Sequence, residues 1–173
     1  SGHDWMYAPR WLRQGYRVAL LASSDYNELE HALRLLRVIP MMRRTRILLF
    51  PPARGTKPAC SPEEINKRLG AEVVACELKD FEKMLDAADG DAVRAEMQAW
   101  TQGAKAILEP THEDIEKAAR VSIALDQLIR QTQADGLAIG TCMGWLPRGF
   151  PCLAFARLRD RGIPAACEGD MDS

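Results

Sequence analysis

The feature that most constrains the fold of this chain is a series of short, uninterrupted apolar runs separated by segments with helical spacing. Such runs are typical of strands that are buried on both faces, as in parallel sheets. Strands that alternate with helices form βαβ units. The sequence therefore predicts an α/β fold: a three-layer, mainly parallel five-stranded sheet, flavodoxin-like or Rossmann-like, with helices on both faces. The runs lie at residues 17–22, 46–50, 71–76, 137–142 and 163–167.

The segments between the runs carry signals of helix starts and ends. Ser61 can cap a helix whose first position is Pro62, and Gly70 can end that helix. Thr111 can cap a long helix in which apolar residues recur at helical spacing. Together these signals predict helices at residues 4–14, 28–36, 61–70, 79–88, 91–108 and 111–129, and one that begins near residues 151–152.

The domain organisation follows from the length and from the opening helix. A chain of 173 residues is long enough for one domain with a full core. The helix at residues 4–14 has no strand before it, and we interpret it as the tail of an upstream element. Residues 15–173 are then expected to be the α/β domain of a larger, truncated multidomain protein.

Composition narrows the classes of partner. The formal net charge of −1 gives no electrostatic reason to expect nucleic acid or an anionic membrane surface. No stretch reaches the ~18–20 apolar residues that a membrane span needs. The cysteines form no C-x-x-C pair, which argues against a zinc cluster and against a disulfide scaffold. We therefore expect a cytoplasmic protein that has neither nucleic acid nor a membrane as a partner.

Two acids form the main candidate site. Glu168 and Asp170 flank Gly169 directly after the last apolar run. Ligands bind at the carboxyl ends of parallel strands in open α/β sheets. Two carboxylates there can bind Mg²⁺ or Mn²⁺, or act as a base on a carbon-bound proton. The same acids would equally suit the start of a following helix, so the spacing alone leaves both interpretations open.

A second candidate is the loop at residues 142–150, which leaves the fourth apolar run. Trp145 offers an aromatic face and Arg148 offers hydrogen-bond donors, a combination that suits a polyol. The alternative is a packed loop with a solvated arginine.

Other kinds of chemistry have less support in the sequence. It contains neither the G-x-G-x-x-G nor the G-x-x-x-x-G-K-[ST] phosphate-binding pattern. The three histidines do not occur in a pattern that indicates nucleophilic catalysis. A thiol or redox protein that uses Cys142, Cys152 or Cys167 is a more distant possibility.

The C-terminal part of the chain carries a specific resemblance. Residues 151–155 read Pro-Cys-Leu-Ala-Phe, and residues 160–170 read Asp-Arg-Gly-Ile-Pro-Ala-Ala-Cys-Glu-Gly-Asp. This segment resembles the end of the central domain in L-fucose and L-arabinose isomerase-like proteins. Less specific matches lie at residues 69–73 and 134–139, so the resemblance extends over about residues 15–173.

The resemblance implies a three-domain aldose–ketose isomerase that forms homo-oligomers. In that family a divalent cation, usually Mn²⁺, binds between the central and C-terminal domains. Glu168 would be a ligand of the metal, with Asp170 close by, and the substrate would be a small sugar. A carboxylate would move a proton between C1 and C2 of the sugar through an enediol.

The chain departs from the family pattern at one position. The family has a second acidic ligand after the preceding strand, whereas residues 141–145 read Thr-Cys-Met-Gly-Trp and contain no carboxylate. Cys142 is the candidate to replace that acid as ligand or base. Two hypotheses follow: a fragment of a metal-dependent sugar isomerase-like protein, or a non-catalytic, flavodoxin-like sugar-binding or assembly domain derived from it.

Overall fold

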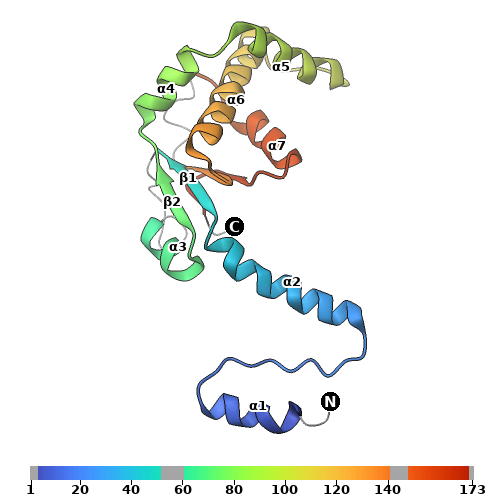
Figure 1. The fold of residues 1–173 in the computed structure, drawn as a ribbon. Coiled ribbons are helices and arrows are strands. Elements are labelled where there is room, and N and C mark those ends of the chain that lie inside the picture. The colour runs from blue at the N-terminus through green and yellow to red at the C-terminus, as the bar shows by residue number, and fades with distance from the viewer. Residues whose placement is uncertain (1–3, 52–60, 141–147, 172–173) are drawn as a thin grey trace. The chain divides into compact units, whose positions relative to one another are not determined.

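The computed structural model describes residues 4–51, 61–140 and 148–171 (Figure 1). The chain divides into two compact units, residues 1–40 and residues 41–173. Each unit is described by itself below.

The first unit contains helix α1 (Asp4–Arg13) and most of helix α2 (Tyr26–Met42). Helix α1 confirms the prediction, and α2 is longer than the predicted 28–36. The strand predicted at residues 17–22 is wrong, because this segment is irregular and mostly exposed. An apolar run becomes a strand only when a neighbour pairs with its backbone, and no described residue does so here.

The second unit is built on a parallel sheet in the order β2-β1-β3-β4 (Figure 1). These four strands match the other four predicted strands, so the described sheet has four strands and not the predicted five. The chain order of the strands reverses between β1 and β3. The strands are β1 (Arg46–Phe50), β2 (Glu72–Ala75), β3 (Gly136–Ile139) and β4 (Ala165–Ala166).

Local signals account for the helices of the second unit. The Ser61 hydroxyl accepts a hydrogen bond from the Glu64 N–H, and Gly70 ends that helix with φ +80°. Thr111 and Asp114 form a reciprocal capping box. The helices are α3 (Pro62–Leu69), α4 (Leu78–Asp86), α5 (Gly90–Gly103), α6 (His112–Thr132) and α7 (Cys152–Asp160).

Helix α5 is shorter than predicted. The prediction continued it to residue 108, but it ends at Gly103. Glycine is a poor helix former, because it loses more backbone freedom in a helix than other residues do.

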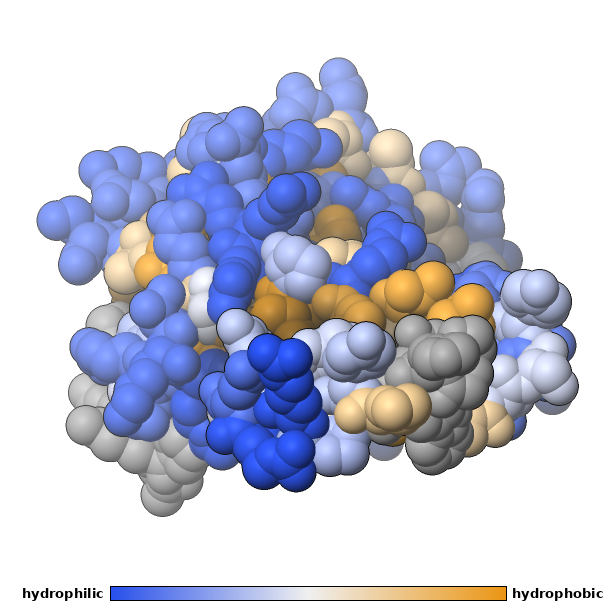
Figure 2. Space-filling view, turned by 60° about the horizontal axis from the view of Figure 1, so that its bottom comes forward, coloured by the Kyte–Doolittle hydropathy of each residue, from blue (hydrophilic) through white to orange (hydrophobic). Residues whose placement is uncertain are grey.

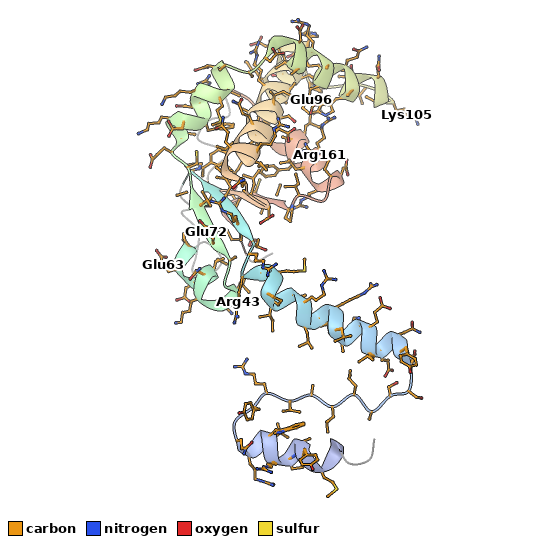
Figure 3. The ribbon with its side chains drawn as sticks, viewed as in Figure 1. Arg43, Glu63, Glu72, Glu96, Lys105 and Arg161 are labelled. Carbon is orange, nitrogen blue, oxygen red and sulfur yellow. The ribbon has the colours of Figure 1, made fainter. Side chains whose placement is uncertain are left out.

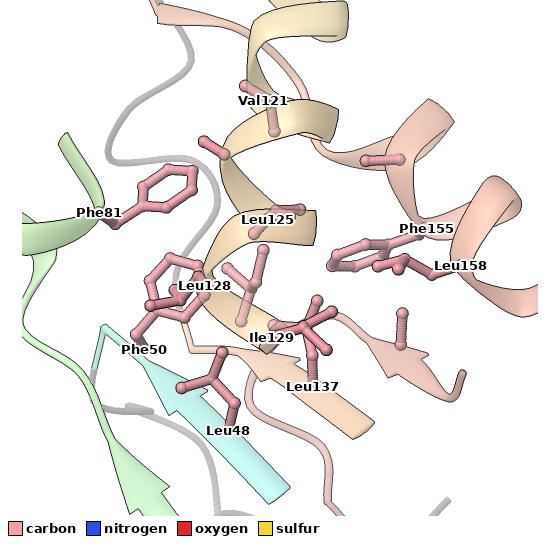
Figure 4. Packing of buried hydrophobic residues seen from close by; sticks show 14 of the residues in the cluster. Leu48, Phe50, Phe81, Val121, Leu125, Leu128, Ile129, Leu137, Phe155 and Leu158 are labelled. Carbon is pink, nitrogen blue, oxygen red and sulfur yellow. The ribbon is translucent and has the colours of Figure 1, made fainter. Parts of the chain in front are cut away.

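One face of the sheet packs against α4, α6 and α7 (Figure 4). Leu48, Phe50, Leu137 and Ile139 alternate along β1 and β3 and point to this side. The ring of Phe50 lies 4.8 Å from that of Phe81 on α4, measured between centroids. This cluster is the main core of the described residues, and it includes Val121, Leu125, Leu128 and Ile129 of α6 and Phe155 and Leu158 of α7.

The opposite face of the sheet packs against α3. Ile47 and Leu49 of β1 and Ala138 of β3 form a second cluster with Ile65 of α3 and Met171. Helices therefore lie on both sides of the sheet, and the alternation of side chains along each strand explains why these runs are apolar throughout.

A buried carboxylate, that of Glu96, contacts side chains of two neighbouring helices; Figure 3 labels it on α5. Glu96 on α5 is 6% exposed, and it accepts a hydrogen bond of 2.8 Å from the Ser122 hydroxyl on α6. Its Oε1 atom also lies 2.8 Å from Nε of Arg157 on α7. A buried charge is costly unless it is paired and hydrogen-bonded. Both partners are present, so Glu96 serves the packing of α5, α6 and α7.

Exposed apolar side chains are unevenly distributed along the chain. Helix α2 has no buried residue, and Leu29, Leu33 and Leu36 on it are 43–63% exposed. Most of the large exposed apolar side chains among the described residues precede residue 42. Polar residues dominate the face drawn in Figure 2, with apolar surface gathered between them. The first unit thus has little core of its own.

Candidate functional site

The turn after β4 lies at the carboxyl edge of the sheet, by which we mean the ends of the strands at Phe50, Ala75, Ile139 and Ala166. The Gly169 N–H donates a hydrogen bond of 2.8 Å to the Ile139 carbonyl, at the last residue of β3. Gly140 directly follows β3, and its N–H donates a hydrogen bond to the Phe50 carbonyl at the end of β1. The turn that carries Glu168 and Asp170 therefore lies at the end of β3, which is one of the two strands between which the strand order reverses. Ligands usually bind beside such a point in open α/β sheets.

The backbone of this turn is left-handed at two successive residues. Glu168 has φ +59° and Gly169 has φ +71°. The Asp170 N–H then donates to the Cys167 carbonyl at 3.1 Å. A left-handed conformation costs a non-glycine residue roughly 1–2 kcal/mol, so the surroundings of Glu168 must compensate for it. This reversal also explains why β4 ends at Ala166, one residue before the predicted end.

Burial changes sharply along the turn. Glu168 is exposed, Asp170 is half-buried, and Met171 is 9% exposed within the cluster on the α3 side of the sheet. One carboxylate is thus open to solvent while the next lies at the margin of the core.

The donor chemistry of the turn suits a hard cation, but the set of donors is incomplete. Carboxylate oxygens are ligands that Mg²⁺ and Mn²⁺ prefer. The described residues contain no group of three or more His, Cys, Asp or Glu side chains that could hold a metal ion. Glu168 and Asp170 would therefore supply two ligands, and the others would have to come from outside the described residues.

Arg148 lies against helix α4. Its guanidinium pairs with the carboxylate of Asp86, and its Nη1 atom lies 4.0 Å from the carboxylate of Glu82. The next residue, Gly149, is held tightly against α6, since a Cβ atom there would lie 2.8 Å from the Lys117 carbonyl oxygen. The end of this loop therefore has a defined position. Cys142 and Trp145, the other candidates from this loop, lie outside the described residues.

Arg148 forms one wall of a polar pocket of about 490 Å³. Sequence reasoning missed the other charged residues of this pocket. The signal that could have found them is the i,i+4 spacing of Glu113 with Lys117 and of Glu116 with Arg120. The pocket is lined by Leu85, Asp86, Glu113, Glu116, Lys117, Arg120 and Arg148.

The charges that line the pocket are paired with one another. Lys117 lies 2.7 Å from Glu113, and Arg120 lies 2.9 Å from Glu116. The hydrogen bond with Glu113 raises the pKa of the Lys117 amine. Hydrogen-bond donors and acceptors alternate on this wall with no excess of charge, which suits a neutral polar ligand such as a polyol.

The thiols occupy different environments. Burial, followed by the nearby carboxylates of Asp80 and Glu77, raises the pKa of Cys76. Cys152 is exposed at the start of α7, and Cys167 packs against the main core. A raised pKa keeps a thiol protonated and less reactive, so Cys76 does not favour thiol chemistry.

Neither a scan against protein-family models nor a search of curated proteins finds a match. Within the described ranges, no helix has both the length and the apolar character needed to cross a membrane.

Proposed function

We propose that this chain is a flavodoxin-like, three-layer α/β domain of a metal-dependent aldose–ketose isomerase-like protein. The observation that carries the proposal is the hydrogen bond from Gly169 to Ile139, because it fixes the Glu168–Gly169–Asp170 turn at the carboxyl edge. The strand order β2-β1-β3-β4 supports the flavodoxin-like assignment, since that fold has the order 2-1-3-4-5 with its ligand site between strands 1 and 3.

The two acids would have different roles. A bound Mn²⁺ would supply Lewis-acid polarisation of the sugar carbonyl and hydroxyl. Glu168, which is exposed, is the residue that would hold the cation. Asp170 is half-buried beside it and would add a second ligand oxygen or move a proton between C1 and C2 of the sugar. Cys142 would take the place of the missing second acid as ligand or base.

The sugar would be recognised by the loop that follows β3. Arg148 keeps donors close to the Asp86 carboxylate, so a sugar hydroxyl could both accept from one and donate to the other. Trp145 would supply the aromatic face. The protein would act in the cytoplasm as a homo-oligomer, with a small sugar as its partner.

Replacing one carboxylate oxygen tests this proposal. We expect Glu168→Gln in the full-length protein to weaken Mn²⁺ binding at least about tenfold, because an amide oxygen is a poorer ligand than a carboxylate. Glu109→Gln removes an exposed carboxylate elsewhere and should leave the affinity unchanged. Isothermal titration calorimetry with MnCl₂ measures both. An unchanged affinity in Glu168→Gln would refute the assignment of this site.

The second candidate function is a non-catalytic sugar-binding or assembly domain on the same scaffold. The observation that favours it is the absence of any carboxylate in residues 141–145. Incubation of the full-length protein with a panel of aldoses and Mn²⁺, followed by assay for ketoses, separates the two functions. Turnover would eliminate the non-catalytic candidate, and binding of a sugar without turnover would favour it.

A further inference from the structure

The residue that follows the two acids is anchored in the core. Met171 is 9% exposed and lies in the cluster that contains Ile47, Leu49 and Ile65. Two residues earlier, the Gly169 N–H donates to the Ile139 carbonyl at 2.8 Å. Asp170 is thus the only residue between a hydrogen bond to the sheet and a side chain buried on the α3 side of it.

The turn needs such an anchor. The left-handed conformation of Glu168, with φ +59°, is unfavourable for a residue that has a Cβ atom. The hydrogen bond from the Asp170 N–H to the Cys167 carbonyl closes the turn, but it closes over Glu168, which is exposed. A buried apolar side chain immediately after the turn resists its opening, because opening would move that side chain into water.

We propose that Met171 is a positioning residue for Glu168 and Asp170. Its buried side chain keeps the left-handed turn closed, and the closed turn presents both carboxylates in one orientation at the carboxyl edge of the sheet. The role of this orientation in binding a divalent cation rests on the proposed function. The closure of the turn by Met171 does not, and it has a readout of its own.

Ile65 provides a matched control. It lies in the same cluster as Met171 and is 2% exposed, but it belongs to α3 and is far from the turn in sequence. Ile65→Ala therefore removes a similar amount of core packing without removing the anchor. Met171→Leu keeps the volume and should restore the anchor.

The experiment compares Met171→Ala, Met171→Val, Met171→Leu and Ile65→Ala in the full-length protein. The first readout is amide hydrogen exchange of Gly169 by NMR, relative to the amide of Leu137, which donates to the Pro164 carbonyl within the sheet. We expect Met171→Ala to raise the ratio of the Gly169 exchange rate to the Leu137 exchange rate about tenfold, because the turn opens locally. Met171→Leu and Ile65→Ala should keep the wild-type ratio, and Met171→Val should fall between.

The second readout is Mn²⁺ affinity by calorimetry. Loss of a group that orients metal ligands typically weakens binding about 10- to 100-fold, and we expect that range for Met171→Ala with rescue by Met171→Leu. An unchanged Gly169 ratio in Met171→Ala and Met171→Val would overturn the inference, and so would an equal effect of Ile65→Ala. If the wild type binds no Mn²⁺ while Met171→Ala loosens Gly169, the proposed function fails and the anchoring role stands.

Discussion

At the scale of single residues, the distance between a glycine and its neighbouring backbone decides whether a side chain can replace the glycine's hydrogen. Gly149 has φ +132°, and a Cβ atom would lie 2.8 Å from the Lys117 carbonyl oxygen and 3.0 Å from Val121 Cγ2. Gly162 also has a positive φ, of +77°, but a Cβ atom there would meet nothing within 4 Å. Of these two glycines, Gly149 is the one that combines a strained backbone with a clash against the backbone of α6.

We therefore expect Gly149→Ala to destabilise the protein by about 2–4 kcal/mol, since strain and overpacking add. Gly162→Ala should cost only about 1–2 kcal/mol, which is the cost of a left-handed backbone for a residue with a Cβ atom. Urea unfolding followed by circular dichroism measures both. Equal losses for the two variants would show that the approach of residue 149 to α6 is looser than in the structure.

At the scale of elements, the stability of helix α6 depends on the capping box that Thr111 and Asp114 form at its first turn. The Thr111 N–H and hydroxyl donate to Asp114 Oδ2 at 2.8 and 2.6 Å, and the Asp114 N–H donates to the Thr111 hydroxyl. The two hydrogen bonds that the Asp114 carboxylate accepts lower its pKa, and the bond from the Thr111 hydroxyl has the larger effect. A lowered pKa in the folded state adds stability above the unfolded pKa of roughly 3.9, and that stability is lost as the pH falls through the folded value.

We expect Thr111→Ala to cost about 1 kcal/mol of unfolding free energy at neutral pH, as cap removal usually does. Asp114→Asn should lose stability at neutral pH, and this deficit should vanish as the pH falls below about 4. Urea titrations at several pH values between about 2 and 7 check both variants. A deficit of Asp114→Asn that persists unchanged at the lowest pH would contradict the assigned role of the ionised carboxylate.

At the scale of the whole molecule, the two units differ in how much apolar surface they bury. The core clusters of the described residues lie wholly within residues 41–173: the two on the faces of the sheet, and a third, smaller one in which Val93 and Met97 of α5 pack with Ile115 and Ala119 of α6. In the first unit Ala8 is the one buried apolar residue among the described side chains. A helix without tertiary packing is marginal in water, because nucleation is costly and few hydrogen bonds repay it.

We expect a polypeptide of residues 41–173 to unfold cooperatively on its own, and a peptide of residues 1–40 to be largely non-helical in water. Thermal melts followed by circular dichroism test both parts, with the chain of 173 residues as the reference. Absence of a cooperative transition in residues 41–173 would show that its core needs the first unit.

Local signals in the sequence determined much of this protein. Ser61, Gly70 and Thr111 mark helix ends through hydrogen bonds to the nearest turn, so they act wherever the chain lies. The apolar runs at residues 46–50 and 137–142 lead to β1 and β3, since such runs are stable as strands when both faces are covered. The position of Glu168 and Asp170 at a strand end was also predictable from the last apolar run.

Other features were decided only by the tertiary structure. The run at residues 17–22 is as apolar as a strand, but strand formation needs a partner that no local pattern reveals. The strand order, the hydrogen bond from Gly169 to Ile139 and the pairing of Arg148 with Asp86 all join residues that are distant in sequence. The burial of Met171 also depends on residues that are distant in sequence. This apolar residue can act as an anchor only because Ile47 and Leu49 lie in the same cluster.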